Sequence, residues 1–382
     1  MMRERNLYRL NGIILTLIFC FFIFTPFIGG LIQQDKQVSN VEKRNLNPLP
    51  SMPASVAEFI NFPRQFNLYY ADHFGLREKL TKKYFKMINK LNGKSSVDDV
   101  TTGKDGWLFL GSIRPGYKRF NDPFGDVTNV NLYSVAELEE FSRSITRLKN
   151  WLAQQGIQYI FIITPNKHTI YFDKLPEHIK KQNSESATDQ LISYLRQHTD
   201  VKLVDLRSAL FKAKNKQQLY FKYDTHWNHY GANIAQNEIL KGIKTFFPEQ
   251  IKPVLLMPEQ FNLLTKTDSD LAAFAKITGA QDIDPRPTFN RSCSIVDKKA
   301  KIKLTDTFTM RCDANNLTAL VFRDSFFTAL EPYISRSFKR STYIWHRINY
   351  QSLSKHIERD KPDIVIDEVI ERTLPYLPEL DN

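Results

Sequence analysis

The sequence predicts a three-layer α/β domain, in which helices cover both faces of a parallel sheet. Two observations support this prediction. Short apolar runs at residues 157–163, 201–206, 319–322 and 363–366 alternate with segments of helical periodicity, which is typical of β-α-β units. The run at 157–163 is almost entirely apolar and stops at Pro165, as expected for a strand that is buried on both faces.

Length and composition agree with a large globular domain that carries an appendage. The chain has 382 residues, of which 42% are hydrophobic and 25% are charged. This balance is typical of a protein that buries a proper core. It excludes a disordered chain, a coiled coil, a membrane protein with many spans and a small disulfide-stapled domain.

The helices between these strands are marked by capping residues and apolar spacing. Ser134 and Glu137 form a capping-box pattern that opens a helix, and Gly156 ends it. A turn at residues 103–107 leads into a strand that ends at residue 110. Further helices are expected at residues 187–197, 230–247 and 352–359 and from residue 325 onward, and a further strand at residues 342–345. Residues 250–315 break the alternation and are interpreted as an insertion.

The region before the α/β domain divides into three parts. Residues 1–35 contain a cytoplasmic tail and an anchor, and residues 36–53 are rich in Asn and Pro and are interpreted as a stalk. A capping-box pattern at Ser55 starts a helical region that extends to about residue 93, with a break expected at Pro63. We therefore place a stalk and helical region at 36–95 and the catalytic domain at 96–382.

The N-terminal segment predicts a single membrane anchor. The 25 residues between Arg9 and Asp35 carry no charge, and residues 13–32 are mostly Ile, Leu and Phe. About 20 apolar residues suffice for a helix to cross a bilayer. Arg3, Arg5 and Arg9 precede this run, so the positive-inside rule places the N-terminus in the cytoplasm. A cleaved signal peptide remains an alternative; otherwise the rest of the chain lies in the periplasm, held at the bacterial inner membrane.

Charge and cysteine content fit an exported domain. Outside the tail the chain keeps 50 basic and 40 acidic residues, a net charge of +10 that favours anionic lipid or an acidic polymer as a partner. Nucleic acid is not expected as a partner on that side of the membrane. Cys293 and Cys312 are the two cysteines outside the anchor. In an oxidising compartment they could form a disulfide, and two free thiols are the alternative.

The first candidate catalytic segment is residues 223–227, Tyr-Asp-Thr-His-Trp. In an extended segment, side chains two residues apart project to the same side. Asp224 could therefore accept a hydrogen bond from the His226 ring, fix its tautomer and stabilise the imidazolium form. The same pair could also be a structural polar contact or part of a metal site together with Asp72, His73 and His229.

The second candidate segment follows the strand at residues 319–322. Ser325 stands where a helix is expected to begin. Its hydroxyl could cap that helix, or it could be a nucleophile beside free N–H groups that hold an oxyanion. Because the carboxyl ends of parallel strands meet in one crevice, Ser325, His226 and Asp224 together suit acyl transfer.

At these two segments the sequence resembles the alginate O-acetyltransferase family (AlgJ and AlgX, with the DHHW proteins). Residues 224–227 and 323–326 match its paired signatures, and residues 72–77, 105–109, 165–167 and 367–372 also resemble it. The resemblance implies an SGNH-hydrolase-like fold and a Ser325, His226, Asp224 triad. In ordinary SGNH hydrolases the serine precedes the Asp/His pair, whereas here the pair comes first, as in this family.

The resemblance also implies a mechanism and partners. Ser325 would carry an acetyl group, and the Phe326 N–H with a second donor would hold the oxyanion. The acceptor would be a hydroxyl of an exported polysaccharide, alginate-like or another exopolysaccharide, and the donor a membrane-bound O-acyltransferase. No metal or other cofactor is expected. Lys167 could touch the site or form a surface or ion-paired contact, and Arg323 could steady the Ser325 turn or form a salt bridge at the strand end. A membrane-anchored acetyl esterase and a non-catalytic export scaffold are the alternatives.

Overall fold

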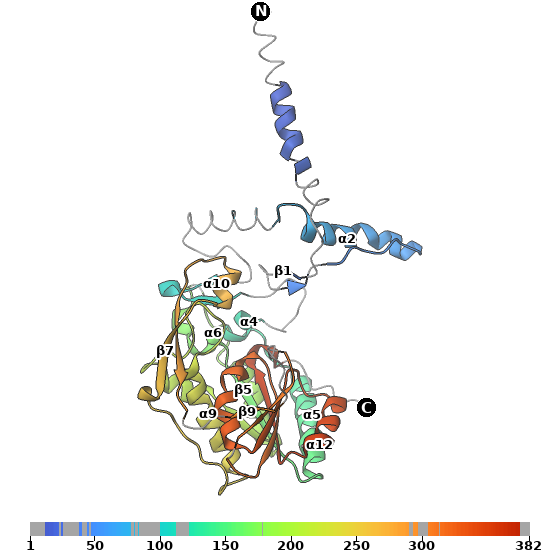
Figure 1. Cartoon of the computed structure of the whole chain (residues 1–382). Helices are drawn as coiled ribbons and strands as arrows, with labels where there is room; N and C mark the ends of the chain where they lie inside the picture. Colours follow the sequence, from blue (N-terminus) through green and yellow to red (C-terminus); the bar gives the residue numbers. More distant parts are fainter. Residues whose placement is uncertain are drawn as a thin grey trace, which may run out of the picture. The chain divides into compact units, whose positions relative to one another are not determined.

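The structure is a computed structural model, and the chain divides into two units (Figure 1). One unit comprises residues 1–97 and 273–278, and the other comprises residues 98–272 and 279–382. The structure describes residues 12–22, 24–25, 38–39, 44–45, 47–77, 80, 83, 100–111, 122–177, 179–289, 293–296, 305–312 and 314–374.

In the first unit, the longest element with defined bounds is α2 (Val56–His73). Ser55 caps it by accepting a hydrogen bond from the Glu58 N–H. The expected break at Pro63 is wrong, because α2 runs through this proline. Pro63 lacks the N–H that would bond to the carbonyl of Phe59, but both residues are exposed, so water can satisfy that carbonyl. The short strands β1 (Val38–Ser39) and β2 (Arg44–Asn45) pair antiparallel.

The predicted anchor is only partly described. Residues 12–22 and 24–25 are helical, and the rest of the apolar run lies outside the described residues. None of the helices in the described residues is long and apolar enough to cross a membrane. The helical region expected at 78–93 also lies almost entirely outside the described residues.

The second unit contains a seven-stranded sheet in the order β6-β5-β13-β11-β12-β10-β9. The first five strands are parallel, and β10 and β9 continue the sheet antiparallel beyond β12. The bounds are β5 (Gln158–Thr164), β6 (Lys202–Asp205), β9 (Ser294–Ile295), β10 (Phe308–Arg311), β11 (Thr318–Phe322), β12 (Arg340–Ile344) and β13 (Ile364–Ile370). All five parallel strands were predicted.

Helices cover both faces of this sheet, which confirms the three-layer prediction. Side chains alternate along β5, so Ile160 and Ile162 face one core while Phe161 and Ile163 face the other. The first core is closed by α8 (Arg207–Ala213), α9 (His229–Lys244) and α11 (Glu331–Ile334), and the second by α5 (Val135–Ala153), α7 (Ala187–His198) and α12 (Tyr350–Asp360). Figure 1 shows α9 on one side of the sheet and α5 and α12 on the other.

The all-parallel sheet is the part of the fold prediction that needs correction. Both antiparallel strands come from residues 250–315, the segment interpreted as an insertion. Thr309 of β10 and Thr342 of β12 exchange a buried hydrogen bond of 3.0 Å, which helps to fix this edge. The same segment also forms η3 (Pro258–Gln260), the hairpin of β7 (Phe261–Lys266) and β8 (Asp282–Pro287), and α10 (Asp270–Phe274).

The remaining elements lie around the sheet. The predicted strand ending at residue 110 is β4, which pairs with β3 in a hairpin. The bounds are β3 (Val100–Thr102), η1 (Lys104–Gly106), β4 (Leu108–Leu110), α4 (Pro123–Val127), α6 (Lys167–Ile170), η2 (Phe172–Lys174), η4 (Ser325–Ala329), η5 (Ser335–Ser337) and η6 (Glu371–Thr373).

Cys293 and Cys312 are joined by a disulfide that spans 19 positions of sequence. Closing a loop of this length is expected to contribute about 3 kcal/mol to the free energy of unfolding. The double variant Cys293→Ser/Cys312→Ser should lose about this amount in urea unfolding. Reductant should destabilise the native protein to a similar extent and leave the double variant unchanged. Equal stability of the two proteins without reductant would contradict the prediction.

Candidate active site

Asp224 and His226 lie in a closed loop between α8 and α9. Two backbone contacts close the loop: a β-bridge between Tyr220 and Trp227, and a hydrogen bond from the Phe221 N–H to the His226 carbonyl. The segment is therefore not the extended strand end that the sequence suggested. The Asp224 carboxylate still reaches His226, because Oδ1 accepts from both the backbone N–H and the ring of that residue.

Ser325, His226 and Asp224 form a continuous hydrogen-bonded relay. Ser325 Oγ lies 2.8 Å from His226 Nε2, and His226 Nδ1 lies 2.7 Å from Asp224 Oδ1. Ser325 is partly exposed, whereas the Asp224 side chain is only 6% exposed. The nucleophile, base and orienting carboxylate thus stand in the order required for proton transfer from the serine.

The Asp-His loop contacts the serine segment through Trp227 and Phe326. The indole N–H of Trp227 donates to the Phe326 carbonyl at 2.9 Å, and the two rings pack edge to face. The His226 ring lies 4.8 Å from the same Phe326 ring, centroid to centroid. Trp227 is almost fully buried and holds these two segments together.

The capping residue after β11 is Asp324. Its side chain accepts a hydrogen bond of 2.8 Å from the Phe326 N–H, and Ser325 is the first residue of η4, a 3₁₀ helix. The prediction that the Phe326 N–H holds an oxyanion is therefore wrong for this arrangement, because that donor is already bonded to a carboxylate. The alternative in which Ser325 caps the helix is wrong as well, since its hydroxyl faces His226.

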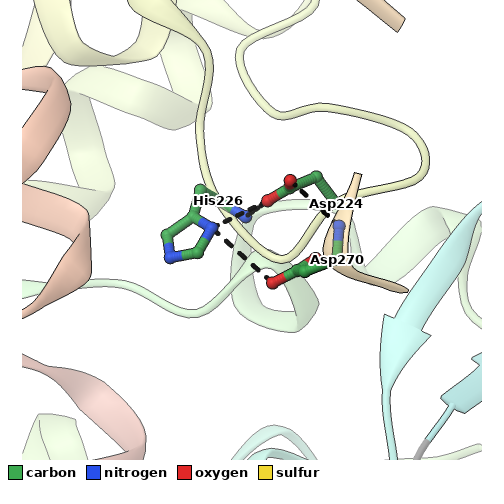
Figure 2. A group of neighbouring side chains, drawn as sticks. All are labelled: Asp224, His226 and Asp270. Carbon is green, nitrogen blue, oxygen red and sulfur yellow. Dashed lines mark hydrogen bonds and ion pairs between the residues drawn. The ribbon is translucent and has the colours of Figure 1, made fainter. Parts of the chain in front are cut away.

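A second carboxylate, Asp270, lies beside the pair (Figure 2). Its Oδ2 is 3.8 Å from His226 Nδ1, and its Oδ1 accepts a hydrogen bond of 2.7 Å from the Thr225 N–H. Its own N–H donates to Asp224 Oδ2 at 3.2 Å. Asp270 thus supports both members of the pair, and the sequence analysis missed it because it belongs to the irregular segment 250–315.

Two further residues of that segment hold the Asp-His loop. Asp282 accepts hydrogen bonds from the backbone N–H groups of Lys222 and Tyr223. Lys266 Nζ lies 3.4 Å from Asp224 Oδ2. Acidic and basic residues in an irregular segment carry no spacing signal, so the sequence alone could not have identified them.

Asp224, His226 and Asp270 also have the spacing of a metal site, since one candidate ligand atom of each lies within 4.8 Å of the others. The hydrogen-bond distances account for this closeness, because the pair is joined at 2.7 Å and Nε2 of the same ring faces Ser325. His229 is buried against Tyr333, and His73 is bonded to the Asn47 carbonyl. Within the described residues of the second unit, this group of ligand atoms does not include His229.

Lys167 is a buried support for the site. Its ammonium donates to the carbonyls of Leu108, Lys222 and Asp224 at 2.6, 3.0 and 3.0 Å, and it is 1% exposed. Among the described residues, no carboxylate oxygen lies within 4.0 Å of it, so the surface and ion-pair interpretations are wrong. Lys167 contacts the site through the Asp224 backbone.

Arg323 supports the serine turn from the other side. It pairs with Glu331 at 3.2 Å and donates to Thr328 Oγ1 at 3.2 Å and to the Asp324 carbonyl at 3.4 Å. The salt-bridge interpretation is therefore correct, and the same residue also steadies the segment that carries Ser325.

The comparisons with known proteins match this fold. The pattern of the family described as "SGNH hydrolase-like domain, acetyltransferase AlgX" matches residues 100–321, which is more than half of the chain. The chain belongs to this family. The match ends four residues before Ser325, so the assignment of the serine rests on the geometry above.

The curated relatives of this AlgX-family chain cover only part of it. It is 28% identical over 201 residues to the probable alginate O-acetylase AlgJ of Azotobacter vinelandii, which is 52% of this chain and 45% of that protein. It is 27% identical over 202 residues to the protein of the same name from Pseudomonas syringae pv. tomato, with coverage of 50% and 44%. The matches thus span less than half the length of these relatives.

A solved structure shares the fold. PatB1 of Bacillus cereus with a sulfonyl adduct superposes with a TM-score of 0.51 at 18% identity, covering 72% of this chain and 97% of that one. At this level of identity the match shows the fold alone, which agrees with the three layers described above.

Electrostatics prepare His226 in this AlgX-family chain to act as a base. Burial lowers the pKa of His226, but the hydrogen bond and charge of Asp224, with the charge of Asp270, outweigh burial and raise it above its ordinary value. Burial opposes the charged form of Asp224, yet its contacts with His226 and Lys266 hold its pKa well below the usual range. The pKa of Asp270 is raised, first by burial and then by the charge of Asp224.

The pH dependence of kcat/KM should change when the charge of Asp270 is removed. His226 accepts a proton only when neutral, so kcat/KM for an acetyl ester should fall as the pH drops through its raised pKa. Asp270→Asn keeps an acceptor for the Thr225 N–H but removes one charge that raises this pKa. In Asp270→Asn, we expect the fall of kcat/KM on the acid side of the pH profile to occur at lower pH. The maximal kcat/KM should change by less than tenfold. Asp268→Asn, which changes an exposed neighbour, is the control. The prediction would be contradicted if the acid side of the kcat/KM profile of Asp270→Asn stayed at the same pH or moved to higher pH.

Lys167 should be required for stability. Lys167→Met removes a donor from three carbonyl oxygens, of which that of Lys222 keeps the Leu108 N–H, and each buried group left unsatisfied costs about 1–3 kcal/mol. The free energy of unfolding in urea should fall by about 3 kcal/mol or more. Lys212→Met, an exposed lysine on α8, should change it by less than about 0.5 kcal/mol. Similar stability of the two variants would show that the carbonyls find other partners.

Proposed function

We propose that this protein is a polysaccharide O-acetyltransferase that works through an acetyl group on Ser325. The observation that supports this most directly is the relay from Ser325 through His226 to Asp224, with contacts of 2.8 and 2.7 Å. The AlgX family description and the names of the relatives point to the same activity.

The reaction would run in two half-reactions. Ser325 Oγ attacks the carbonyl carbon of an acetyl donor while its proton moves to His226 Nε2, and the same proton then leaves with the departing group. A sugar hydroxyl next attacks the acetyl-serine, again giving its proton to His226, which returns it to Ser325 as the ester bond breaks. Asp224 remains ionised throughout and stabilises the imidazolium.

The partners in this proposal follow from the location. The uncharged run after Arg9 supports a single anchor in the bacterial inner membrane, with the N-terminus in the cytoplasm and the catalytic unit in the periplasm. A membrane-bound O-acyltransferase would supply acetyl groups there, and the acceptor would be an exported polysaccharide. The net charge of +10 outside the N-terminal tail favours an acidic, alginate-like polymer.

The test is turnover of a chromogenic acetyl ester and labelling by a serine-reactive fluorophosphonate, with the full-length chain in detergent. Ser325→Ala should abolish labelling and reduce turnover by at least about 10³-fold, because the covalent route is lost. Ser193→Ala, an exposed serine of α7, should behave like the native protein. EDTA should leave turnover unchanged if no metal takes part.

Transfer is distinguished from hydrolysis by adding an acidic polysaccharide. Acetyl ester appearing on the polymer, dependent on Ser325, supports the transferase, whereas acetate released without polymer acetylation supports the esterase. A folded native protein that neither turns over the ester nor takes the label would contradict both, and would favour a non-catalytic scaffold.

A further inference from the structure

Arg372 lies at the same edge of the sheet as Ser325. Strands β11 and β13 are parallel neighbours, and Phe322 of β11 is in register with Asp367 of β13. Ser325 follows its strand by three residues, and Arg372 lies in η6 directly after β13. Ser325 and Arg372 therefore both follow the carboxyl ends of neighbouring parallel strands, which is where ligands bind in open α/β sheets.

Arg372 is positioned by contacts that leave its charge without a close partner. One guanidinium nitrogen donates to Asn166 Oδ1 at 3.3 Å, and the guanidinium carbon lies 5.4 Å from the centroid of the Phe326 ring. Asn166 is 1% exposed and is itself held by Asp126 and by Glu371. Within the described part of the chain, no carboxylate lies within 4.0 Å of Arg372.

The Phe326 ring links Arg372 to the relay. This ring lies against the guanidinium on the one hand and 4.8 Å from the His226 ring on the other. The positive charge of Arg372 acts on His226, where it lowers the pKa of the imidazole against the raising effect of Asp224 and Asp270. Arg372 is thus near enough to influence the charge that develops during proton transfer.

Acyl transfer requires hydrogen-bond donors for the oxyanion, and the two N–H groups nearest to the nucleophile supply at most one. The tetrahedral intermediate places a negative charge on the former carbonyl oxygen, which usually receives two or more N–H donors. The N–H of Ser325 opens η4 and has no acceptor within that helix. The next N–H, that of Phe326, is bonded to Asp324.

We propose that the guanidinium of Arg372 is the second oxyanion donor of this site, acting together with the Ser325 N–H. This inference rests on the proposed function. An arginine remains charged and offers several N–H groups in a planar fork, of which Asn166 uses one.

The chemical step balances with these groups alone. The bond from Ser325 Oγ to the acetyl carbon forms, the π electrons of the carbonyl move onto its oxygen, and the serine proton goes to His226 Nε2. Arg372 and the Ser325 N–H donate to that oxygen. When the carbonyl re-forms, the bond to the leaving group breaks and His226 returns the proton to it.

The experiment compares Arg372→Gln, Arg372→Lys and the control Arg143→Gln in the full-length protein with a neutral chromogenic acetyl ester. Arg143 is exposed on α5, with a side chain that is 62% accessible. We expect Arg372→Gln to lower kcat by about 100-fold or more at unchanged thermal midpoint. Fluorophosphonate labelling should slow in parallel, because its adduct carries the same tetrahedral oxygen. Arg372→Lys should recover part of the rate, and the acid limb of the Gln variant should move to higher pH as His226 loses a nearby cation.

Two outcomes would overturn the inference while leaving the proposed function in place. One is ester turnover and labelling within threefold of native in Arg372→Gln. The other is normal ester hydrolysis with transfer lost only for a uronate polymer, which would make Arg372 a binding group for the acceptor carboxylate. If Arg372→Gln does not fold, Arg372→Met takes its place, and native-like kinetics of that variant, which has no donor, would be decisive against the inference. A native protein without turnover would instead overturn the proposed function, and this inference with it.

Discussion

The arrangement of the site depends on keeping a buried carboxylate ionised at Asp224. Removing a charge from water costs several kcal/mol unless hydrogen bonds and opposite charges replace the solvent. At Asp224 the replacement is complete: Oδ1 accepts from the backbone and ring of His226, and Oδ2 accepts from the Asp270 N–H and lies near Lys266. Since Asp270 and Lys266 come from the segment 250–315, that segment is part of the electrostatic support of the relay and is not a passive insertion.

The sheet positions the serine side of the site. Five parallel strands with a core on each face fix the carboxyl ends of β11 and β13 side by side, so that Ser325 and Arg372 are carried by rigid, buried elements. The Asp-His loop has no strand of its own at this edge. It is held by the buried contact between Trp227 and the Phe326 carbonyl and by Lys167, which binds the Asp224 carbonyl. Both the serine that gives up the proton and the histidine that receives it are therefore held in place by buried contacts.

Elements with strong periodicity could be predicted from the sequence, and contacts between loops could not. The helix α5 carries apolar residues at helical spacing, and β5 is a short apolar run that ends at Pro165; both elements were predicted. The relay itself could be anticipated, because Asp224, His226 and Ser325 are residue types with matching chemistry. Asp270, Lys266 and Asp282 could not, because their roles depend on how an irregular segment folds back over the Asp-His loop. The Phe326 N–H was misassigned for a similar reason: a neighbouring side chain, Asp324, takes the donor locally.

The charges around His226 suggest why the site contains both Asp270 and Arg372. Burial opposes the imidazolium form of His226, and the hydrogen bond and charge of Asp224 favour it. The charge of a second carboxylate, Asp270, also raises the pKa of the imidazole, while burial and then the charge of Asp224 raise the pKa of Asp270 itself. The positive charge of Arg372 acts in the opposite direction and lowers the pKa of the imidazole. The base strength of His226 is thus a balance of three charges, and only Asp224 among them can be recognised from the spacing of residues in the sequence.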